Sequence, residues 1–328
     1  MPDIRVIADD LLDLAIVPSF TDLGPRIRRR LFGWEDLDRL RMEGRVVLIT
    51  GASSGLGLAA AIQLARMGAE LRLVVRDPVK GEGALTQIHE AVPGSDVRVY
   101  LADLSDLGSV RGVVDRILSE EERLDVLVNN AGALLPQRQT SVDGFEMTFA
   151  TMVLGPFVLT NGLEPLLERT AANTGRARVI FVSSGGMYLQ GLHLDDLQME
   201  REPYRGSVAY ARAKRAQIVL TELWARRWRD RGIAVHAMHP GWADTPGVEA
   251  SLPGFNKIMG PRLRTADEGA DTIVWLAASD EAARWTGRFW LDRRPRPTER
   301  FPGTGVSPDE ARRLWEECER LTEGASRS

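Results

Sequence analysis

One tyrosine and one lysine stand four residues apart in this chain, Tyr210 and Lys214. On a helix, this spacing places both side chains on the same face as neighbours. An ammonium group beside a phenol favours the phenolate, and so we expect Lys214 to lower the pKa of Tyr210 from its usual value of about 10. Such a tyrosine can exchange protons with an alcohol or a carbonyl near neutral pH. The same spacing also arises by chance on solvated helix faces, so the surrounding elements must decide between the two interpretations.

A glycine-rich segment connects the first expected strand, residues 46–50, to the first expected helix. Three of its glycines suit a dinucleotide site: Gly51 permits the sharp turn, Gly55 lets backbone approach a pyrophosphate, and Gly57 lets the helix pack close to the strand. The N-terminus of the helix offers unpaired N–H groups and a positive dipole end to the phosphates. A glycine-rich turn can be purely structural, but its position between a strand and a helix favours cofactor binding.

The residues after the second expected strand indicate which dinucleotide binds. The strand ends at Val75 and is followed by Arg76 and Asp77. An acid at this place holds the ribose 2′-hydroxyl of NAD, whereas an arginine accommodates the 2′-phosphate of NADP. Ser53 can add a hydrogen bond to that phosphate, and Asp77 is typical of the N-cap of the next helix. We therefore predict NADP(H) as the preferred cofactor, with NAD(H) as the alternative.

Short β-branched runs alternate with segments of helical length from Gly44 onward. The runs lie at residues 46–50, 71–75, 97–101, 126–128, 178–182 and 233–237. This alternation predicts an α/β fold, a Rossmann-type doubly wound parallel sheet of about seven strands with helices on both faces. No linker divides residues 44–292, which we expect to form one catalytic domain. Residues 293–328 are predicted to be an extended loop and a final helix, with a capping box between Ser307 and Glu310.

The N-terminal arm, residues 1–43, has a different pattern. Apolar residues recur at helical spacing, with aspartates on other faces; they are Ile4, Ile7, Leu11 and Leu14. Residues 26–34 then combine arginines with aromatic side chains, a composition that can rest on a membrane surface. The acidic first helix would be repelled by anionic lipid. We therefore favour an arm that packs on its own domain or on a second subunit, and keep peripheral membrane contact as the alternative.

Composition excludes several classes of protein. The 328 residues are 44% hydrophobic and 27% charged, as in a soluble globular protein, and the net charge of −4 gives no reason to expect nucleic acid as a partner. The single cysteine, Cys318, excludes an intrachain disulfide and favours a reducing compartment. Aspartates interrupt the early apolar residues, so we expect no secretory signal, and no apolar run suits a membrane span. We predict a cytoplasmic protein. The histidines show no metal-ligand spacing, so we predict no metal site.

Taken together, these elements resemble the short-chain dehydrogenase/reductase superfamily, of the single-domain type, over about residues 45–292. The matching motifs stand in the family's order: the glycine loop Thr50–Gly57, Asp103 after the third strand, Asn129–Gly132, Ser184 after the fifth strand, Tyr210 with Lys214, and Pro240-Gly241 with Thr245. Further segments, such as Ser183–Met187 and His239–Gly247, resemble the subgroup called dehydrogenase/reductase family member twelve. The tail at Ala311–Trp315 is similar to those of retinol-dehydrogenase-like relatives, which suggests a lipophilic carbonyl as substrate.

The resemblance implies a role for each matching residue. Tyr210 would give a proton to the developing alkoxide, Ser184 would hold the carbonyl oxygen, and Lys214 would also bond the nicotinamide ribose. The cofactor-binding residues that it implies are Gly51, Ser53, Ser54, Gly55, Leu56, Gly57, Arg76, Asp103, Leu104, Asn130, Ala131, Gly132, Tyr210, Lys214, Pro240, Gly241 and Thr245. We expect His239 to be a hydrogen-bonded strand-end histidine. Trp242, Met187 and the region 248–263 are predicted to line or cover the substrate pocket.

One position departs from the family pattern. Met152 stands where an asparagine usually helps to hold a water that links the lysine to solvent. A thioether is a poor hydrogen-bond partner, so a backbone carbonyl would have to keep that water. Pro156 removes a backbone donor from the same helix and is expected to bend it.

The leading prediction is an enzyme, an NADP(H)-dependent oxidoreductase that transfers a hydride between nicotinamide and a carbonyl or alcohol. The alternative is a non-catalytic NADP(H)-binding sensor or scaffold protein. A third class, the sugar epimerases and dehydratases, usually has a shorter glycine loop and a larger substrate domain. In the family that this chain resembles, the long helices that correspond to residues 143–170 and 207–230 often pair between subunits. We therefore expect a homodimer or homotetramer, unless the N-terminal arm covers these helices.

Overall fold

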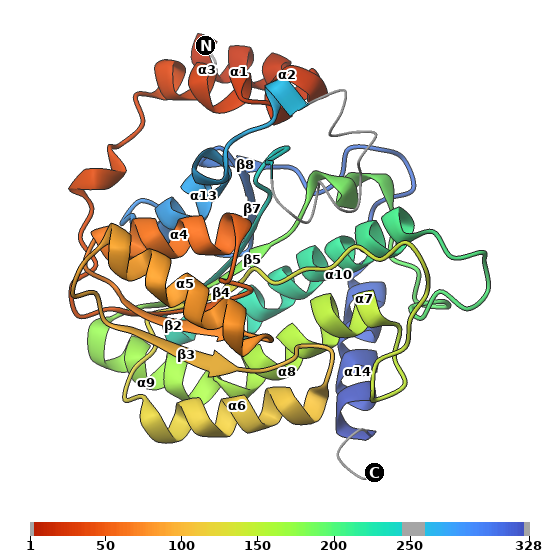
Figure 1. Cartoon of the computed structure of the whole chain (residues 1–328). Coiled ribbons are helices and arrows are strands. Elements are labelled where there is room, and N and C mark those ends of the chain that lie inside the picture. The colour runs from red at the N-terminus through yellow and green to blue at the C-terminus, as the bar shows by residue number, and fades with distance from the viewer. Residues whose placement is uncertain (1–2, 245–259, 325–328) are drawn as a thin grey trace.

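The computed structural model describes residues 3–244 and 260–324, and its centre is one eight-stranded sheet with helices on both faces (Figure 1). The strand order is β3-β2-β1-β4-β5-β6-β7-β8. The strands are β1 (Val46–Thr50), β2 (Glu70–Val75), β3 (Val97–Leu101), β4 (Val126–Asn129), β5 (Ala177–Val182), β6 (Ile233–Met238), β7 (Arg288–Leu291) and β8 (Arg294–Arg296). All neighbouring pairs are parallel except β7 and β8. The predicted Rossmann-type α/β fold is confirmed.

The eighth strand corrects two expectations, the strand number and the extended loop after residue 292. β8 pairs antiparallel with β7, with Leu291 opposite Arg294. The two turn residues between them, Asp292 and Arg293, both have positive φ, at 52° and 57°. This conformation matches the tight turns that join twisted antiparallel strands. Pro295 is tolerated because β8 lies at the edge of the sheet.

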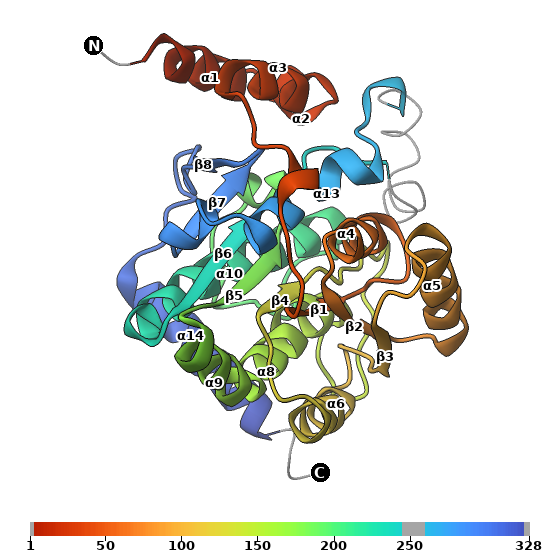
Figure 2. The ribbon, with the colours of Figure 1, turned by 90° about the vertical axis from the view of Figure 1, so that its left-hand side faces the viewer.

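Two sets of helices cover the sheet (Figure 2). On one face lie α4 (Gly55–Arg66), α5 (Pro78–Ala91) and α13 (Ala266–Ala278), and on the other lie α6 (Leu107–Glu120), α8 (Gly155–Gly162), α9 (Glu164–Thr174), α10 (Gly206–Arg227) and α14 (Pro308–Gly324). Buried apolar residues of the sheet form one core with each set. The predicted helix starts at Asp77 and Ser307 are confirmed: Asp77 accepts from the N–H groups of Val79 and Lys80, and Ser307 and Glu310 form reciprocal bonds.

The C-terminal helix α14 covers part of α8 and α10. The ring of Trp315 lies 4.9 Å from that of Phe157 on α8 and 5.3 Å from that of Trp224 on α10. The expected homodimer through these helices stays a prediction. It would have to form beside α14, and α14 rather than the N-terminal arm occupies this face.

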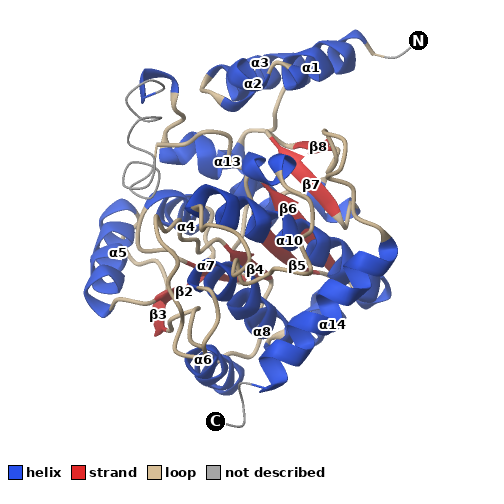
Figure 3. Ribbon diagram, turned by 90° about the vertical axis from the view of Figure 1, so that its right-hand side faces the viewer, coloured by secondary structure: helices blue, strands red, loops and turns tan. Residues whose placement is uncertain are grey.

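The N-terminal arm forms three helices, α1 (Ile4–Leu14), α2 (Ile16–Phe20) and α3 (Leu23–Phe32), which lie side by side at one end of the molecule (Figure 3). They pack on their own chain, as favoured from the sequence. Arg28 of α3 is fully buried and donates to Asp9 of α1 at 2.7 Å and to Asp292 of the β7–β8 turn at 2.5 Å. Arg264 donates to the same Asp292 at 2.6 Å. A buried ion-pair network therefore holds the arm on the domain.

We expect Asp292→Asn to destabilise the protein by about 3–5 kcal/mol, because the substitution leaves buried Arg264 without its counter-charge and buried Arg28 with fewer carboxylate partners. Asparagine tolerates positive φ, so the turn itself is kept. The free energy of unfolding in urea measures the effect. Asp309→Asn removes an exposed partner of Arg312 and should cost less than about 1 kcal/mol. Equal effects of the two substitutions would contradict the role given to Asp292.

Candidate active site

Tyr210 and Lys214 lie on the first turns of α10 as neighbours, as their spacing predicts. Tyr210 is half-buried and Lys214 is buried, at 2% exposure. The Lys214 ammonium donates to the carbonyl of Val182, at the end of β5, over 2.6 Å. It lies 5.4 Å from the centre of the Tyr210 ring. The ammonium is therefore bonded to the strand end and lies near the Tyr210 ring.

Ser184 completes the group from the other side. It follows β5, adopts an extended conformation and accepts a hydrogen bond from the N–H of Gly186 at the start of a 3₁₀ turn, Gly185–Leu189. Its hydroxyl also hydrogen-bonds to Tyr210. Ser183 points elsewhere and donates to the carbonyl of Lys214 at 3.0 Å, which supports the helix. The three predicted catalytic residues thus come together where β5 ends against α10.

The electrostatics correct the prediction for the phenol pKa. Burial raises the pKa of Tyr210 above its ordinary value of 10.0, and the bond from Ser184 opposes this only in part. Burial also lowers the pKa of Lys214 from 10.5 to about 7. Near neutral pH the lysine is therefore only partly charged, and desolvation outweighs its attraction for a phenolate. Tyr210 is a neutral phenol in this structure, which is the form that donates a proton.

The glycine loop is braced from the next strand. The Thr50 hydroxyl accepts the N–H groups of Asn130 and Ala131, each at 3.0 Å, and the Asn130 amide donates to the carbonyls of Thr50 and Gly51. Gly51 has a φ of +65°, and a Cβ there would lie 2.8 Å from the Cα of Ala131. A Cβ on Gly57 would lie 2.5 Å from the carbonyl oxygen of Gly51. The roles predicted for Gly51 and Gly57 therefore match the packing.

The start of α4 fits an anion. Its N-cap, Ser54, is extended and exposed, and no side chain caps the helix. Ser53 and Leu56 are half-buried beside it, and Gly55 has a φ of +55°. The first N–H groups of α4 thus have no side-chain acceptor, which suits the phosphates of a dinucleotide. The residues present therefore fit the predicted cofactor at this point.

Arg76, Asp103 and Leu104, which we predicted at the adenosine end of the cofactor, lie directly after β2 and β3. Arg76 has a side chain that is 75% exposed, 3.8 Å from the carboxylate of Asp103. Asp103 accepts the N–H and the hydroxyl of Ser105, so its carboxylate is held at the strand end. Leu104 is different from its neighbours: its side chain is buried at 5% exposure in the core. Gly132 lies near the catalytic group, since a Cβ there would be 3.8 Å from the Lys214 ammonium nitrogen.

The loop after β6 contains the last group of predicted cofactor-binding residues, Pro240 and Gly241. Pro240 accepts from Arg264 at 2.9 Å, and Gly241 has a φ of +75° and donates its N–H to Nδ1 of His239. Burial and nearby arginines hold the pKa of His239 well below 6.5, so it is the neutral, hydrogen-bonded histidine that we expected. Thr245 and most of the region 248–263 lie outside the described residues. Met187 is fully buried, so the prediction that it lines an open substrate pocket is wrong.

The helix that carries Met152 contains a π-helical turn, Ala150–Leu154, between α7 (Met147–Phe149) and α8. Pro156 lies four residues after Met152 and has no N–H to donate to the Met152 carbonyl. Gln217 of α10 donates its side-chain amide to that carbonyl at 2.7 Å instead. Sequence reasoning missed Gln217. Its signal was a polar residue seven positions after Tyr210, on the same helix face.

Phe20 of the N-terminal arm was also missed. Its carbonyl accepts the N–H of Trp242 at 2.7 Å, and its ring packs against Trp242 and His239, with centroids 5.7 and 4.5 Å away. A Cβ on Gly185 would lie 2.6 Å from this ring. The arm therefore forms part of the wall beside Ser184. No local motif announces this contact, because it joins segments more than 150 residues apart.

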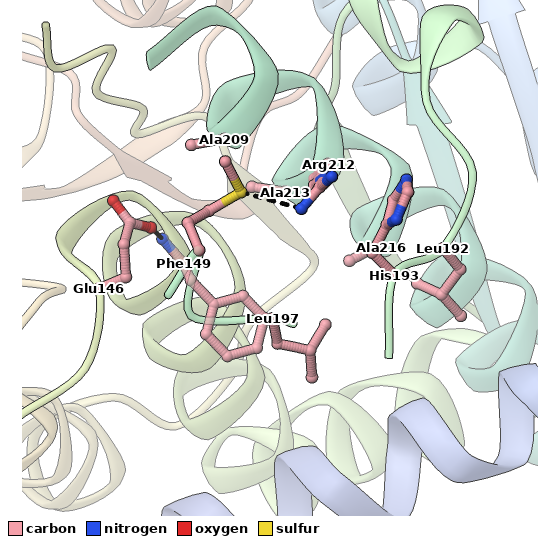
Figure 4. Close-up of a pocket in the computed structure, with 10 residues that line it drawn as sticks. Glu146, Phe149, Leu192, His193, Leu197, Ala209, Arg212, Ala213 and Ala216 are labelled. Atoms are coloured by element: carbon pink, nitrogen blue, oxygen red, sulfur yellow. Dashed lines mark hydrogen bonds between the residues drawn. The ribbon is translucent and has the colours of Figure 1, made fainter. Parts of the chain in front are cut away.

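A small pocket lies beside α10 but apart from the catalytic group (Figure 4). Ala209, Arg212, Ala213 and Ala216 line it, and they form a different face of the helix from Tyr210, Lys214 and Gln217. Arg212 donates to the sulfur of Met199 across the pocket at 3.1 Å. This pocket is therefore a packing feature and does not contain the catalytic side chains. Within residues 3–244 and 260–324, no group of three or more metal-ligating side chains is present.

Lys214→Met should raise the midpoint of thermal unfolding at pH 7, measured without cofactor, because it removes a buried amine. The folded pKa of Lys214, about 7, lies below its unfolded value of 10.5, so the unfolded chain binds more protons between these values. Wild type consequently gains stability as pH rises through this window, and the advantage of the variant should shrink toward pH 10. An advantage that is constant across the window would contradict the lowered pKa.

Comparison with known proteins assigns this chain to a family of dehydrogenases, in agreement with the grouping of Ser184, Tyr210 and Lys214. A family model described as short chain dehydrogenase matches residues 45–253. Human dehydrogenase/reductase SDR family member 12 is 42% identical over 286 residues, which cover 87% of this chain and 88% of that protein. Human retinol dehydrogenase 14 is 36% identical over 313 residues, 90% of each chain. A crystal structure of an uncharacterized protein from Mycobacterium paratuberculosis superposes with a TM-score of 0.70 at 32% identity, over 88% of this chain and 97% of that one.

Proposed function

Because this chain belongs to the short-chain dehydrogenase/reductase family and is thus an oxidoreductase that acts on alcohol and carbonyl groups with a nicotinamide cofactor, we propose that it is an NADPH-dependent carbonyl reductase. The observation that carries the proposal is the meeting of Ser184, Tyr210 and Lys214 at the end of β5. The parallel sheet brings this point to the same edge as the uncapped N-terminus of α4. Ligands of open α/β sheets bind at this edge.

Each side chain has a role in the proposed reduction. The bound cofactor supplies the hydride, and the protein positions and polarises the substrate. Ser184 donates its hydroxyl to the carbonyl oxygen, an interaction that strengthens as negative charge develops there. Tyr210, a neutral phenol, donates its proton to the same oxygen. Lys214, held by Val182, can return a proton to the phenolate because its pKa of about 7 makes it an acid near neutral pH.

Arg76 supports the choice of NADPH. Its guanidinium is largely exposed at the end of β2, where the ribose of the adenosine half binds in such folds. Its neighbour Asp103 accepts two hydrogen bonds from Ser105 and lies 3.8 Å from the guanidinium, so Arg76 is the exposed positive charge at this place. A phosphate with two negative charges binds a guanidinium more strongly than a ribose hydroxyl does.

We propose a lipophilic carbonyl as the substrate class. Phe20 is buried against Gly185 and supports the half-buried Trp242, and Leu189 is 67% exposed nearby in the chain. Apolar walls with few polar groups are usual for sites that bind apolar ligands. The similarity to a retinol dehydrogenase supports the same class.

Tyr210→Phe should reduce turnover of aromatic and aliphatic ketones or aldehydes by at least roughly a hundredfold, since it removes the proton donor. NADPH binding, measured by fluorescence titration, should persist. Tyr204→Phe is the matched control, because Tyr204 bonds to Glu146 and lies outside the catalytic group. Turnover by Tyr210→Phe at the wild-type rate would refute the mechanism, and absence of turnover by wild type with either cofactor would favour a binding protein.

Arg76→Ala should weaken NADPH binding by roughly tenfold or more and leave NADH binding nearly unchanged, because only the 2′-phosphate needs the guanidinium. Isothermal titration of each cofactor measures the two affinities. Arg98→Ala serves as a control, since Arg98 pairs with Glu121 at the sheet edge. Equal losses for both cofactors would show that Arg76 does not read the phosphate.

A further inference from the structure

Large exposed apolar side chains are concentrated on the N-terminal arm. Eight of the fourteen in the described residues lie within α1–α3, although this arm is a small part of the chain. On α1, Ile4 is 79% exposed, Leu11 63% and Leu14 76%. Val17 of α2 is 54% exposed. Such a concentration of exposed apolar side chains indicates an interaction site, because single exposed apolar residues are usual but clusters are not.

Buried ion pairs on the opposite side of α1 fix the orientation of the helix, so that its apolar side chains point outward. Asp9 and Asp13 are the buried residues of α1, at 1% and 7% exposure. Asp9 accepts from Arg28 at 2.7 Å and from Arg296 of β8 at 2.8 Å, and Asp13 pairs with Arg300. These bonds hold the pKa of Asp9 below its ordinary value. Helix α1 is thus inverted relative to a normal surface helix, since its charged side faces the protein and its apolar side faces outward.

The inversion corrects the argument against membrane contact. From the sequence, the aspartates of the first helix were expected to repel anionic lipid. Two of these aspartates are paired inside the protein, which leaves Asp10 and the N-cap residue Asp3 exposed. The same helices expose four arginines, Arg5, Arg26, Arg29 and Arg30. Arg5 pairs with Asp3 and Arg26 with Asp22, which leaves Arg29, Arg30 and Asp10 and a charge of +1, two minus one. The rim of the apolar face is therefore attractive to anionic headgroups.

We propose that the outer face of α1–α3 docks on the surface of a lipid bilayer that contains anionic lipid. Apolar side chains of α1 and α2 enter the headgroup boundary, and the arginines of α3 lie at the level of the headgroups. Contact with a second copy is less favourable, because two such faces would bring arginines of the same sign together. Contact is peripheral: in the described part of the chain, no helix has both the length and the apolar character to cross a bilayer.

The docking face is joined to the active-site wall. Phe20, the last residue of α2, bonds to Trp242 through its carbonyl and packs on His239. In the views of Figures 1 and 2, the three helices form one layer at the end of the molecule near β8 and α13. A bilayer in contact with the outer side of these helices would therefore lie close to the residues beside Ser184. The docking itself does not depend on catalysis.

Co-sedimentation of the full-length protein with vesicles tests the proposal. The probes are vesicles of phosphatidylcholine alone and of phosphatidylcholine mixed with phosphatidylglycerol. Wild type should bind the mixed vesicles, less well at high salt, and bind phosphatidylcholine more weakly. Leu11→Gln with Leu14→Gln should reduce binding to the mixed vesicles by roughly tenfold or more. Val142→Gln, which replaces an apolar residue that is 81% exposed elsewhere, should leave binding unchanged.

Three results would overturn the proposal. Wild type that stays in the supernatant with both kinds of vesicle excludes the lipid surface. Equal losses in the Leu11/Leu14 variant and in Val142→Gln would show that binding is non-specific. Sedimentation equilibrium gives the third readout: a wild-type dimer that the Leu11/Leu14 variant converts to a monomer would identify the face as a contact between copies. Unfolding in urea confirms that the variants are folded, since both leucines are exposed.

Discussion

The hydrogen bond from the Lys214 ammonium to the Val182 carbonyl is the interaction on which the catalytic geometry depends. It joins the start of α10 to the end of β5, and Ser183 strengthens the same junction through the Lys214 carbonyl. Ser184 follows Ser183 at the end of β5, and Tyr210 lies one helical turn before Lys214 on α10. The positions of both residues therefore depend on this contact. The bond also explains why the lysine is buried without an acid as its partner. Burial lowers the pKa of Lys214 to about 7, which makes the amine able to exchange a proton near neutral pH.

A second constraint acts on the opposite side of the site. The turn between β7 and β8 presents Asp292 to two buried arginines, Arg28 from the arm and Arg264 from the segment before α13. Through them the arm is fixed against the loop that contains Gly241 and Trp242. The same network that stabilises the arm thus sets the position of Phe20 beside the site. It also determines which side of α1 faces outward.

Local patterns were sufficient for the parts of the molecule that bonds between near neighbours determine. The alternation of strands and helices, the glycine turn after β1 and the helix caps at Asp77 and Ser307 all agree with the structure. They could be predicted because backbone geometry, capping and side-chain period act over a few residues. β8 was missed because a three-residue strand with a proline has little local signal, and only its pairing with β7 defines it.

The sequence by itself determined which groups can do the chemistry: a tyrosine and a lysine on one helix face, a serine at a strand end and a glycine turn before a helix. Only the tertiary structure decided their electrostatic state, because burial, which spacing does not reveal, raises the pKa of Tyr210 and lowers that of Lys214. The tertiary structure also brings the Gln217 amide to the Met152 carbonyl, to which Pro156 has no N–H to donate, and it places Phe20 beside Ser184. The orientation of α1 was also decided there, since its aspartates found arginines that lie far away in the chain.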